Sequence, residues 1–322
     1  MNNKILAGLV IAALVVGGIW YFTSNQKEEG IVSVKISDRG LASALPIYVA
    51  IEKGYFEKYN IKPELVKLTT GNDVLNALIV NQLDVGEIPI DPLVFAEDKT
   101  NTNTKIFLVG KWSETENRNF DAVFVKKGGD IKSLIDLENR KIGVFPGITA
   151  KTFLAHYLTQ NGVDAQKVEF AELAPNVHLQ SLTSGAISGL FAYQPMVTIA
   201  EKNEEVSKLD ESIFNKLGFN YFAIYAFSGQ FNQNDAVTRT QKALLDAIKY
   251  MESNESDSRQ ILAKYTTLGD ISSQMSYFPQ YHKPNSEDIA GMSDFVNFYK
   301  SKGLIKSTFN EEKIKSLIFT PQ

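Results

Sequence analysis

The chain has 322 residues, 44% of them hydrophobic and 22% charged, which is typical of soluble globular proteins and enough for two domains. It carries 33 basic and 37 acidic residues, a net charge of -4, with no long basic run, which argues against a nucleic-acid-binding surface. It contains no cysteine. Disulfides, thiolate catalysis, cysteine-ligated zinc and a lipid anchor on an N-terminal cysteine are therefore excluded.

An apolar segment lies near the start of the chain. Lys4 is followed by an uncharged run over residues 5–22, close to the minimum length for crossing ~30 Å of hydrocarbon. Trp20 and Tyr21 lie near the end of the run, where amphipathic rings favour the membrane interface, and a polar tether follows over 23–30. The run is longer than the core of a secretory signal and lacks a clear small-residue cleavage site, so we favour an uncleaved anchor over a cleaved signal or a buried core helix. Either membrane reading places residues 31–322 outside the cytoplasm.

Strand-like and helix-like segments alternate after this point. Apolar residues recur at every second position over 31–37, which predicts a strand. A helix is expected from Ser43 to about Tyr59, with Pro46 in its first turn. Further strands are expected over 65–68, 84–87 and 106–109, and further helices from Asn72 or Asp73 to Ile79 and from Pro92.

The same alternation starts again at Asp121. Strands are expected over 121–126, 141–145, 168–173 and 189–193, with helices over 131–137, from Thr149 and from about Asn176 to before Gly185. An aromatic-rich strand over 221–227 precedes a helical C-terminal region that begins at Asp235. Such alternation predicts βα units, mostly parallel sheets and an α/β fold.

An internal echo indicates two similar lobes. The segment from Leu75 to Glu97 and the segment from Leu179 to Glu201 share the order helix, short strand, loop and helix opened by proline. Both contain Pro-x-Val followed by Ala-Glu, and their spacing agrees within one residue. We interpret the echo as duplicated architecture, although apolar residues at helical spacing are common enough to match by chance.

Four segments in the same order resemble the periplasmic substrate-binding proteins of ABC importers, of the nitrate, sulfonate, taurine and thiamine-precursor type. The resemblance extends over residues 31–300. The segments are Pro46–Tyr59 (PIYVAIEKGYFEKY), Asp84-Val-Gly86 with Pro92, Ile131–Val144 with Pro146-Gly-Ile-Thr149, and Ser184-Gly185 with Tyr193-Gln-Pro195.

The resemblance implies the two-lobed periplasmic-binding-protein fold of type II, with a ligand clamped between lobes that two crossing strands join. The crossings are expected near 120–124 and 221–227. The expected division is 1–30 as membrane segment and tether, 31–120 as the first part of lobe 1, 121–222 as lobe 2, and 223–322 as the return to lobe 1. The family also implies a membrane permease and its cytoplasmic ATPase as partners.

Open α/β sheets bind ligands beyond the carboxyl ends of their strands, and helix N-termini there favour anionic groups. Two loops meet this description, Leu41-Ala42-Ser43 after the first strand and Gly147-Ile148-Thr149 at the start of a helix. Thr149 could contact the ligand, cap its helix, or do both. A sulfonate, nitrate or carboxylate group would suit such a site.

Other residues are also candidates for ligand contact, and each has an alternative structural role. Ile90-Asp91 precedes Pro92, and Asp91 could bind an amine or pyrimidine or only favour the helix dipole. Trp112, Tyr193 and Gln194 follow strand ends, where they could supply rings and an amide to the ligand or serve the core. His178 is the only histidine near a predicted binding loop, and core or surface packing remains its default. No metal-ligand spacing or cofactor motif occurs in the sequence.

These features predict a solute-binding protein of an ABC importer on the outer face of the cytoplasmic membrane, anchored by residues 5–22, and not an enzyme. The cargo would be a sulfonate, nitrate or pyrimidine. An enzyme on the same fold is one alternative, but the pyrimidine-making relatives depend on a cysteine-rich motif, and elimination from chorismate-like acids is cytoplasmic. A ligand-sensing regulator is another, but it would carry a helix-turn-helix arm.

Overall fold

The computed structural model describes residues 30–112, 119–231, 235–266, 269–275, 278–306 and 308–320. The chain divides into two units, Met1–Val32 and Ser33–Gln322. Only residues 30–32 of the first unit are described, so the apolar run over 5–22 and its expected role as an anchor lie outside the described residues. No helix in the described part of the chain is long and apolar enough to cross a membrane.

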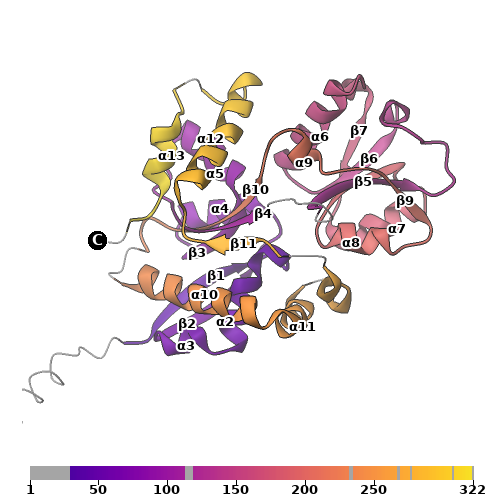
Figure 1. Ribbon diagram of the computed structural model, residues 1–322. Coiled ribbons are helices and arrows are strands. Elements are labelled where there is room, and N and C mark those ends of the chain that lie inside the picture. The colour runs from indigo at the N-terminus through magenta and orange to yellow at the C-terminus, as the bar shows by residue number, and fades with distance from the viewer. Residues whose placement is uncertain are drawn as a thin grey trace, which may run out of the picture. The chain divides into compact units, whose positions relative to one another are not determined.

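Two sheets, each with its own helices, form the second unit (Figure 1). The sheet of the first lobe has six strands in the order β11-β4-β10-β3-β1-β2. Their bounds are β1 Val32–Asp38, β2 Ile61–Lys67, β3 Val85–Pro89, β4 Lys105–Trp112, β10 Tyr221–Phe227 and β11 Gln280–His282. β1 and β3 pair in parallel, whereas β10 is antiparallel to both β3 and β4, and β11 is antiparallel to β4.

The sheet of the second lobe has five strands in the order β7-β6-β8-β5-β9. Their bounds are β5 Asp121–Lys126, β6 Lys141–Val144, β7 Glu169–Glu172, β8 Gly189–Tyr193 and β9 Val206–Glu211. β6 pairs in parallel with β7 and β8, and β5 is antiparallel to β8 and β9. The chain therefore enters this sheet after β4 and leaves it after β9.

The α/β class and the two-lobed fold are confirmed, but the expectation of mostly parallel sheets is wrong. Both sheets are mixed, because β10 returns from the other lobe and runs against β3 and β4, and because β5 enters against β8. β9 and β11 were not among the expected strands. The residue boundaries expected for the lobes stay a prediction.

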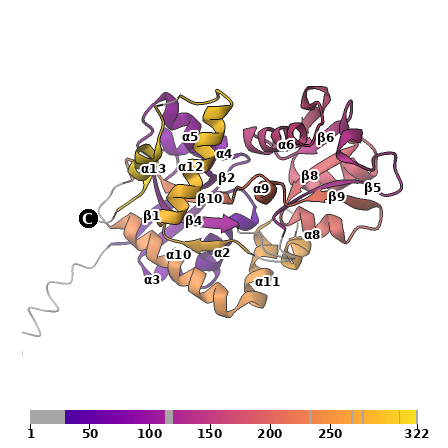
Figure 2. The same ribbon diagram turned by 45° about the horizontal axis from the view of Figure 1, so that its top comes forward.

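Helices cover both faces of each sheet (Figures 1 and 2). On the first lobe, α4, α5, α12 and α13 lie on one face and α2, α3 and α10 on the other. The bounds are α2 Leu45–Glu52, α3 Tyr55–Lys58, α4 Gly71–Ile79, α5 Ile90–Lys99, α6 Ile148–Gln160, α7 His178–Thr183, α8 Met196–Glu201, α9 Ile213–Lys216, α10 Ala236–Ser253, α11 Glu255–Tyr265, α12 Ser286–Ser301 and α13 Glu311–Leu317.

The helix expected over 43–59 is two helices. Gly54 separates α2 from α3 with a φ of 68°, a left-handed conformation that glycine adopts at little cost. A 3-10 turn, Ala42–Ala44, precedes α2, so the α-helix proper begins at Leu45, with Pro46 in its first turn as expected.

Close packing between helix α4 and strand β3 holds this strand in place. β3 is buried along nearly its whole length, and its second residue, Gly86, packs against α4. A Cβ at Gly86 would lie 2.5 Å from Cγ1 of Val74 and 3.0 Å from Cδ1 of Leu78. The absence of a side chain here lets α4 approach the strand.

We expect Gly86→Ala to lower the free energy of unfolding by about 1–3 kcal/mol, because the added methyl overpacks the contact between α4 and β3. The midpoint of thermal unfolding should fall by roughly 2–10 °C. Gly30→Ala is the matched control, since no atom of the described residues lies within 4 Å of a Cβ there. Equal melting temperatures for the two variants would contradict the packing argument.

Candidate functional site

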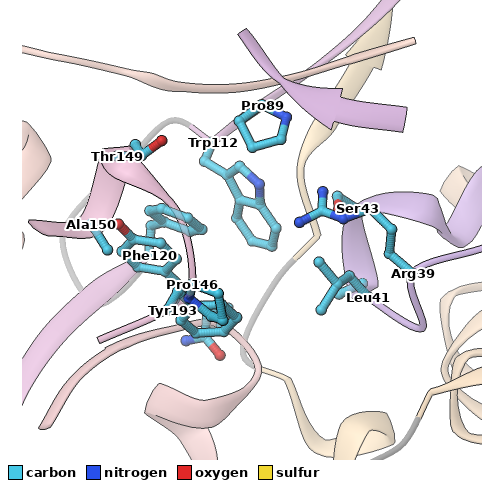
Figure 3. A pocket seen from close by; sticks show the side chains of 13 residues that line it. Arg39, Leu41, Ser43, Pro89, Trp112, Phe120, Pro146, Thr149, Ala150 and Tyr193 are labelled. Carbon is cyan, nitrogen blue, oxygen red and sulfur yellow. The ribbon is translucent and has the colours of Figure 1, made fainter. Parts of the chain in front are cut away.

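Loops from both lobes surround one cavity of about 60 Å³ (Figure 3). Nearly every lining residue follows the carboxyl end of a strand or begins a helix, where α/β folds bind ligands. The lining residues are Arg39, Leu41, Ala42, Ser43, Pro89 and Trp112 from the first lobe, and Phe120, Phe145, Pro146, Thr149, Ala150, Tyr193 and Gln194 from the second.

Buried tyrosine hydroxyls hold the loop after β1 in place. Tyr281 donates a hydrogen bond of 3.1 Å to the carbonyl oxygen of Ala42, and Tyr225 donates to the carbonyl oxygen of Ser43. Burial raises the pKa of both hydroxyls well above the usual value of 10.0, so both remain protonated donors. The loop that carries three predicted site residues is therefore bound to β10 and β11, which come from the far end of the chain.

Arg39, in the same loop after β1, forms an ion pair with Glu87 of β3. Nη1 of Arg39 is 3.6 Å from Oε2 of Glu87, and the two side chains are only 10% and 2% exposed. Desolvation raises the pKa of Glu87, while the charge of Arg39 and a hydrogen bond from Ser43 oppose the rise. Nε of Arg39 has no hydrogen-bond partner among the described residues. Figure 3 shows the guanidinium reaching into the cavity, so a cation with an unused donor faces it.

A row of aromatic rings forms another part of the wall. The centroids of Trp112 and Phe120 are 4.8 Å apart, those of Phe120 and Tyr193 4.9 Å, and those of Tyr193 and Phe145 5.0 Å. The last two pairs are stacked, with interplanar angles of 20° and 15°. The rings come from both lobes and form a continuous apolar surface.

Asp91 and Thr149 join the two lobes beside the cavity. Oγ1 of Thr149 donates a hydrogen bond to Oδ2 of Asp91, whose side chain is buried and does not line the cavity. Desolvation raises the pKa of Asp91 to about 6, and the hydrogen bond from Thr149 acts against the rise. Thr149 is not the cap of its helix, because Gly147 occupies that position at the start of α6 and no side chain caps it.

The amide of Gln194 lies in the cavity wall, but both of its ends have protein partners. Nε2 donates a hydrogen bond of 3.0 Å to the carbonyl oxygen of Asn119, and Oε1 accepts one of 2.9 Å from Thr198. These bonds join the chain before β5 to the start of α8. The geometry gives Gln194 a positioning role in the wall.

Seven of the twelve residues singled out from the sequence line the cavity: Leu41, Ala42, Ser43, Trp112, Thr149, Tyr193 and Gln194. Ile90, Asp91, Gly147, Ile148 and His178 do not. The backbone N–H of Gly147 donates instead to Glu172, and the side chain of Ile148 is 39% exposed.

His178 lies behind the wall. Its Nε2 is 2.7 Å from the carbonyl oxygen of Leu173, and its ring meets Phe145 edge-on at 4.9 Å. Burial lowers the pKa of His178 to about 4, so the ring is neutral at ordinary pH and supports Phe145 from behind.

Sequence reasoning missed six lining residues: Arg39, Pro89, Phe120, Phe145, Pro146 and Ala150. The available signal was position, since four of them (Arg39, Pro89, Phe145 and Pro146) lie at the same strand ends as the residues that were chosen. Arg39 was the most informative, because it is a cation in the loop after the first strand. Its buried partner Glu87 lies 48 positions further along the sequence, and only the pairing of β1 with β3 brings the two together.

A second cavity of about 290 Å³ adjoins the first and shares Arg39, Leu41, Phe145 and Pro146 with it. Lys67 also lines this second cavity and pairs with the buried Asp38 at 2.5 Å. Nowhere in the described residues do three or more His, Asp or Glu side chains gather as a metal site.

Known proteins resemble this chain in sequence and in fold. A family model described as NMT1/THI5 like matches residues 42–257, more than half of the chain. The aliphatic sulphonate-binding protein SsuA of Escherichia coli is 18% identical, with a TM-score of 0.70 over 90% of this chain and 92% of that chain. The nitrate-binding protein NrtA of Synechocystis PCC 6803 is 14% identical, with a TM-score of 0.67 over 90% and 86%.

DszB, crystallised as a cysteine-to-serine variant with biphenyl-2-sulfinic acid, is 14% identical, with a TM-score of 0.62 over 85% and 93%. No curated protein matches the chain. At these identities the solved structures establish the fold and not the ligand. The chain belongs to the NMT1/THI5-like family and has the fold of the type II periplasmic binding proteins.

Proposed function

We propose that this protein is the solute-binding component of an ABC importer and that it captures a small organic or inorganic anion in the cavity between its lobes. The observation that carries the proposal is the guanidinium of Arg39, nine-tenths buried, facing a cavity whose walls come from both lobes. A buried cation with an unused donor is suited to a charge-assisted hydrogen bond with a sulfonate, nitrate or carboxylate.

The rest of the lining supports an anion over an amine. None of the described lining residues is Asp or Glu. Thr149 and Ala150, in the first turn of α6, lie in the wall, and no side chain caps this helix, so its N–H groups add positive potential. Asp91, which would have favoured an amine or pyrimidine, is buried outside the lining and accepts its hydrogen bond from Thr149.

The relatives support the transport role. SsuA and NrtA are named for binding aliphatic sulphonates and nitrate, and both are periplasmic. We infer a membrane permease and a cytoplasmic ATPase as partners, with residues 5–22 as the segment that directs or anchors the chain outside the cytoplasm. The enzyme DszB has the same fold, so catalysis is the competing function, but this chain has no cysteine and no catalytic motif.

Closure of the two lobes around the ligand is the expected mechanism. A ligand that touches Arg39 on one lobe and Thr149 on the other binds the closed state better than the open state, and so stabilises closure. The Thr149–Asp91 hydrogen bond acts in the same direction. Phe153 of the second lobe packs against Phe295 and Phe298 of α12 at 5.2 and 4.7 Å, which adds an apolar contact between the lobes.

We expect Arg39→Gln to weaken anion binding by roughly 10- to 150-fold, the loss of one charge-assisted hydrogen bond. Calorimetric titration with nitrate, ethanesulfonate and benzoate in turn would measure the effect. Because Arg39→Gln leaves Glu87 buried without its counter-charge, the double variant Arg39→Gln/Glu87→Gln separates lost binding from lost folding.

Arg140→Gln is the control for this prediction, since Arg140 is partly exposed, forms an ion pair with the exposed Asp130 and does not line the cavity. It should bind like the parent. A folded double variant that keeps the parent's dissociation constant would refute Arg39 as the anion-binding group. Binding of none of the three anions by the parent, or their chemical turnover, would refute the transport proposal itself.

We expect Asp91→Asn to raise the free energy of unfolding by about 1–3 kcal/mol at pH 7.5 and to change it little at pH 4. The folded pKa of Asp91, about 6, lies above its ordinary value of 3.8, so the folded state binds the proton more tightly. The charged carboxylate therefore destabilises the fold above pH 6, and this cost disappears as the pH falls through 6 toward 4. Urea unfolding at both pH values measures it.

Glu169→Gln serves as the control for the pH prediction, because Glu169 is an exposed member of a surface ion pair with Lys141. It should show no comparable difference between the two pH values. If Asp91→Asn lost stability equally at both, the buried charge would not be the source of the effect.

A further inference from the structure

The row of aromatic rings gives the cavity more apolar surface than a small anion requires. Trp112, Phe120, Phe145 and Tyr193 all line the cavity, together with the apolar Leu41, Ala42, Pro89, Pro146 and Ala150. Nitrate has no apolar group and a short sulfonate has only a small alkyl group, and oxygens held against ring carbons lose their hydration without replacement. The wall therefore fits a ligand with a substantial apolar part.

The guanidinium of Arg39 and the row of rings occupy different parts of the wall. Figure 3 shows Arg39 and Ser43 on the first-lobe side, across the cavity from Phe120 and Tyr193, with the indole of Trp112 between them. The three neighbouring ring pairs have centroids 4.8–5.0 Å apart, the spacing at which an additional flat ring could continue the row. A ligand that extends from Arg39 toward the rings would be acidic at one end and flat at the other.

We propose that the ligand is an aromatic acid, a planar ring that bears a sulfonate or carboxylate, with its acid group on Arg39 and its ring against the Trp112–Phe120–Tyr193 row. This inference rests on the proposed function and names the ligand class of the same cavity. Substituents on the ring would extend past Arg39 and Phe145 into the adjoining cavity of about 290 Å³, which shares both residues.

Ring-on-ring contact distinguishes this class from saturated acids of the same size and charge. Aromatic pairs gain stabilisation beyond the area that they bury, which corresponds to roughly 2- to 13-fold in dissociation constant. Benzenesulfonate and cyclohexanesulfonate carry the same acid group on rings of the same atom count. The ratio of their dissociation constants therefore isolates the contribution of the flat ring.

The test is calorimetric titration of the full chain with benzenesulfonate, cyclohexanesulfonate, methanesulfonate and phenyltrimethylammonium. We expect benzenesulfonate to bind roughly 2- to 13-fold more tightly than cyclohexanesulfonate, methanesulfonate to bind more weakly than both, and the cation not to bind. Trp112 is one of only two tryptophans in the chain, the other being Trp20. In a Trp20→Phe chain, benzenesulfonate should change the emission of Trp112.

Variants locate the preference in the ring row. Trp112→Leu and Phe120→Leu should each reduce the ratio between the two ring sulfonates toward one, while Arg39→Lys should weaken both ligands and leave the ratio in place. Phe170→Leu is the matched control, because Phe170 is a partly buried ring on β7 that does not line the cavity. It should leave both dissociation constants unchanged.

The outcomes separate this inference from the function on which it rests. If cyclohexanesulfonate or methanesulfonate binds as tightly as benzenesulfonate, the aromatic preference is refuted, while the anion-binding function stands. If the ratio persists in both Trp112→Leu and Phe120→Leu chains, the ring row is not its source and the inference is refuted. If the cation binds and no sulfonate does, both the inference and the proposed function are refuted.

Discussion

The buried carboxylate of Glu87 sets the chemistry of the whole cavity. It lies in the middle of β3, a strand enclosed on both faces, where an unpaired charge would cost several kcal/mol. Its counter-charge comes from Arg39, in the loop that leaves the neighbouring strand β1. The need to neutralise a core residue thus brings a guanidinium to the cavity wall and holds its side chain nine-tenths buried.

Contacts around the ion pair hold the loop after β1 in place. Tyr225 and Tyr281 belong to strands that the chain makes only after it has built the second lobe, yet their hydroxyls fix the carbonyl groups of Ser43 and Ala42. The loop after β1 therefore takes up this arrangement only when the C-terminal third has folded back. The second lobe contributes in the same way through His178, whose neutral ring supports Phe145 from behind.

Local patterns in the sequence predicted much of this fold. Alternation of strands and helices predicted both lobes, and the rule that ligands lie beyond strand ends led to seven residues of the cavity wall. The sequence-based predictions failed where contacts between residues far apart in the sequence determine the structure. The mixed sheets follow from strands that cross between lobes, and the Arg39–Glu87 pair depends on which strands are neighbours. Asp91 was predicted as either a ligand group or a helix-start residue, and nothing local in the sequence reveals its hydrogen bond to Thr149.

The ring row also bears on how proteins of this fold diverge. Its members come from strand ends and loops, and the backbones of Trp112 and Tyr193 are held by strand pairing that does not involve the rings. A ring can therefore be exchanged for another side chain without changing strand register. Side chains of the wall can thus differ while the scaffold persists, and chains only 14–18% identical to this one superpose on it with TM-scores of 0.62–0.70.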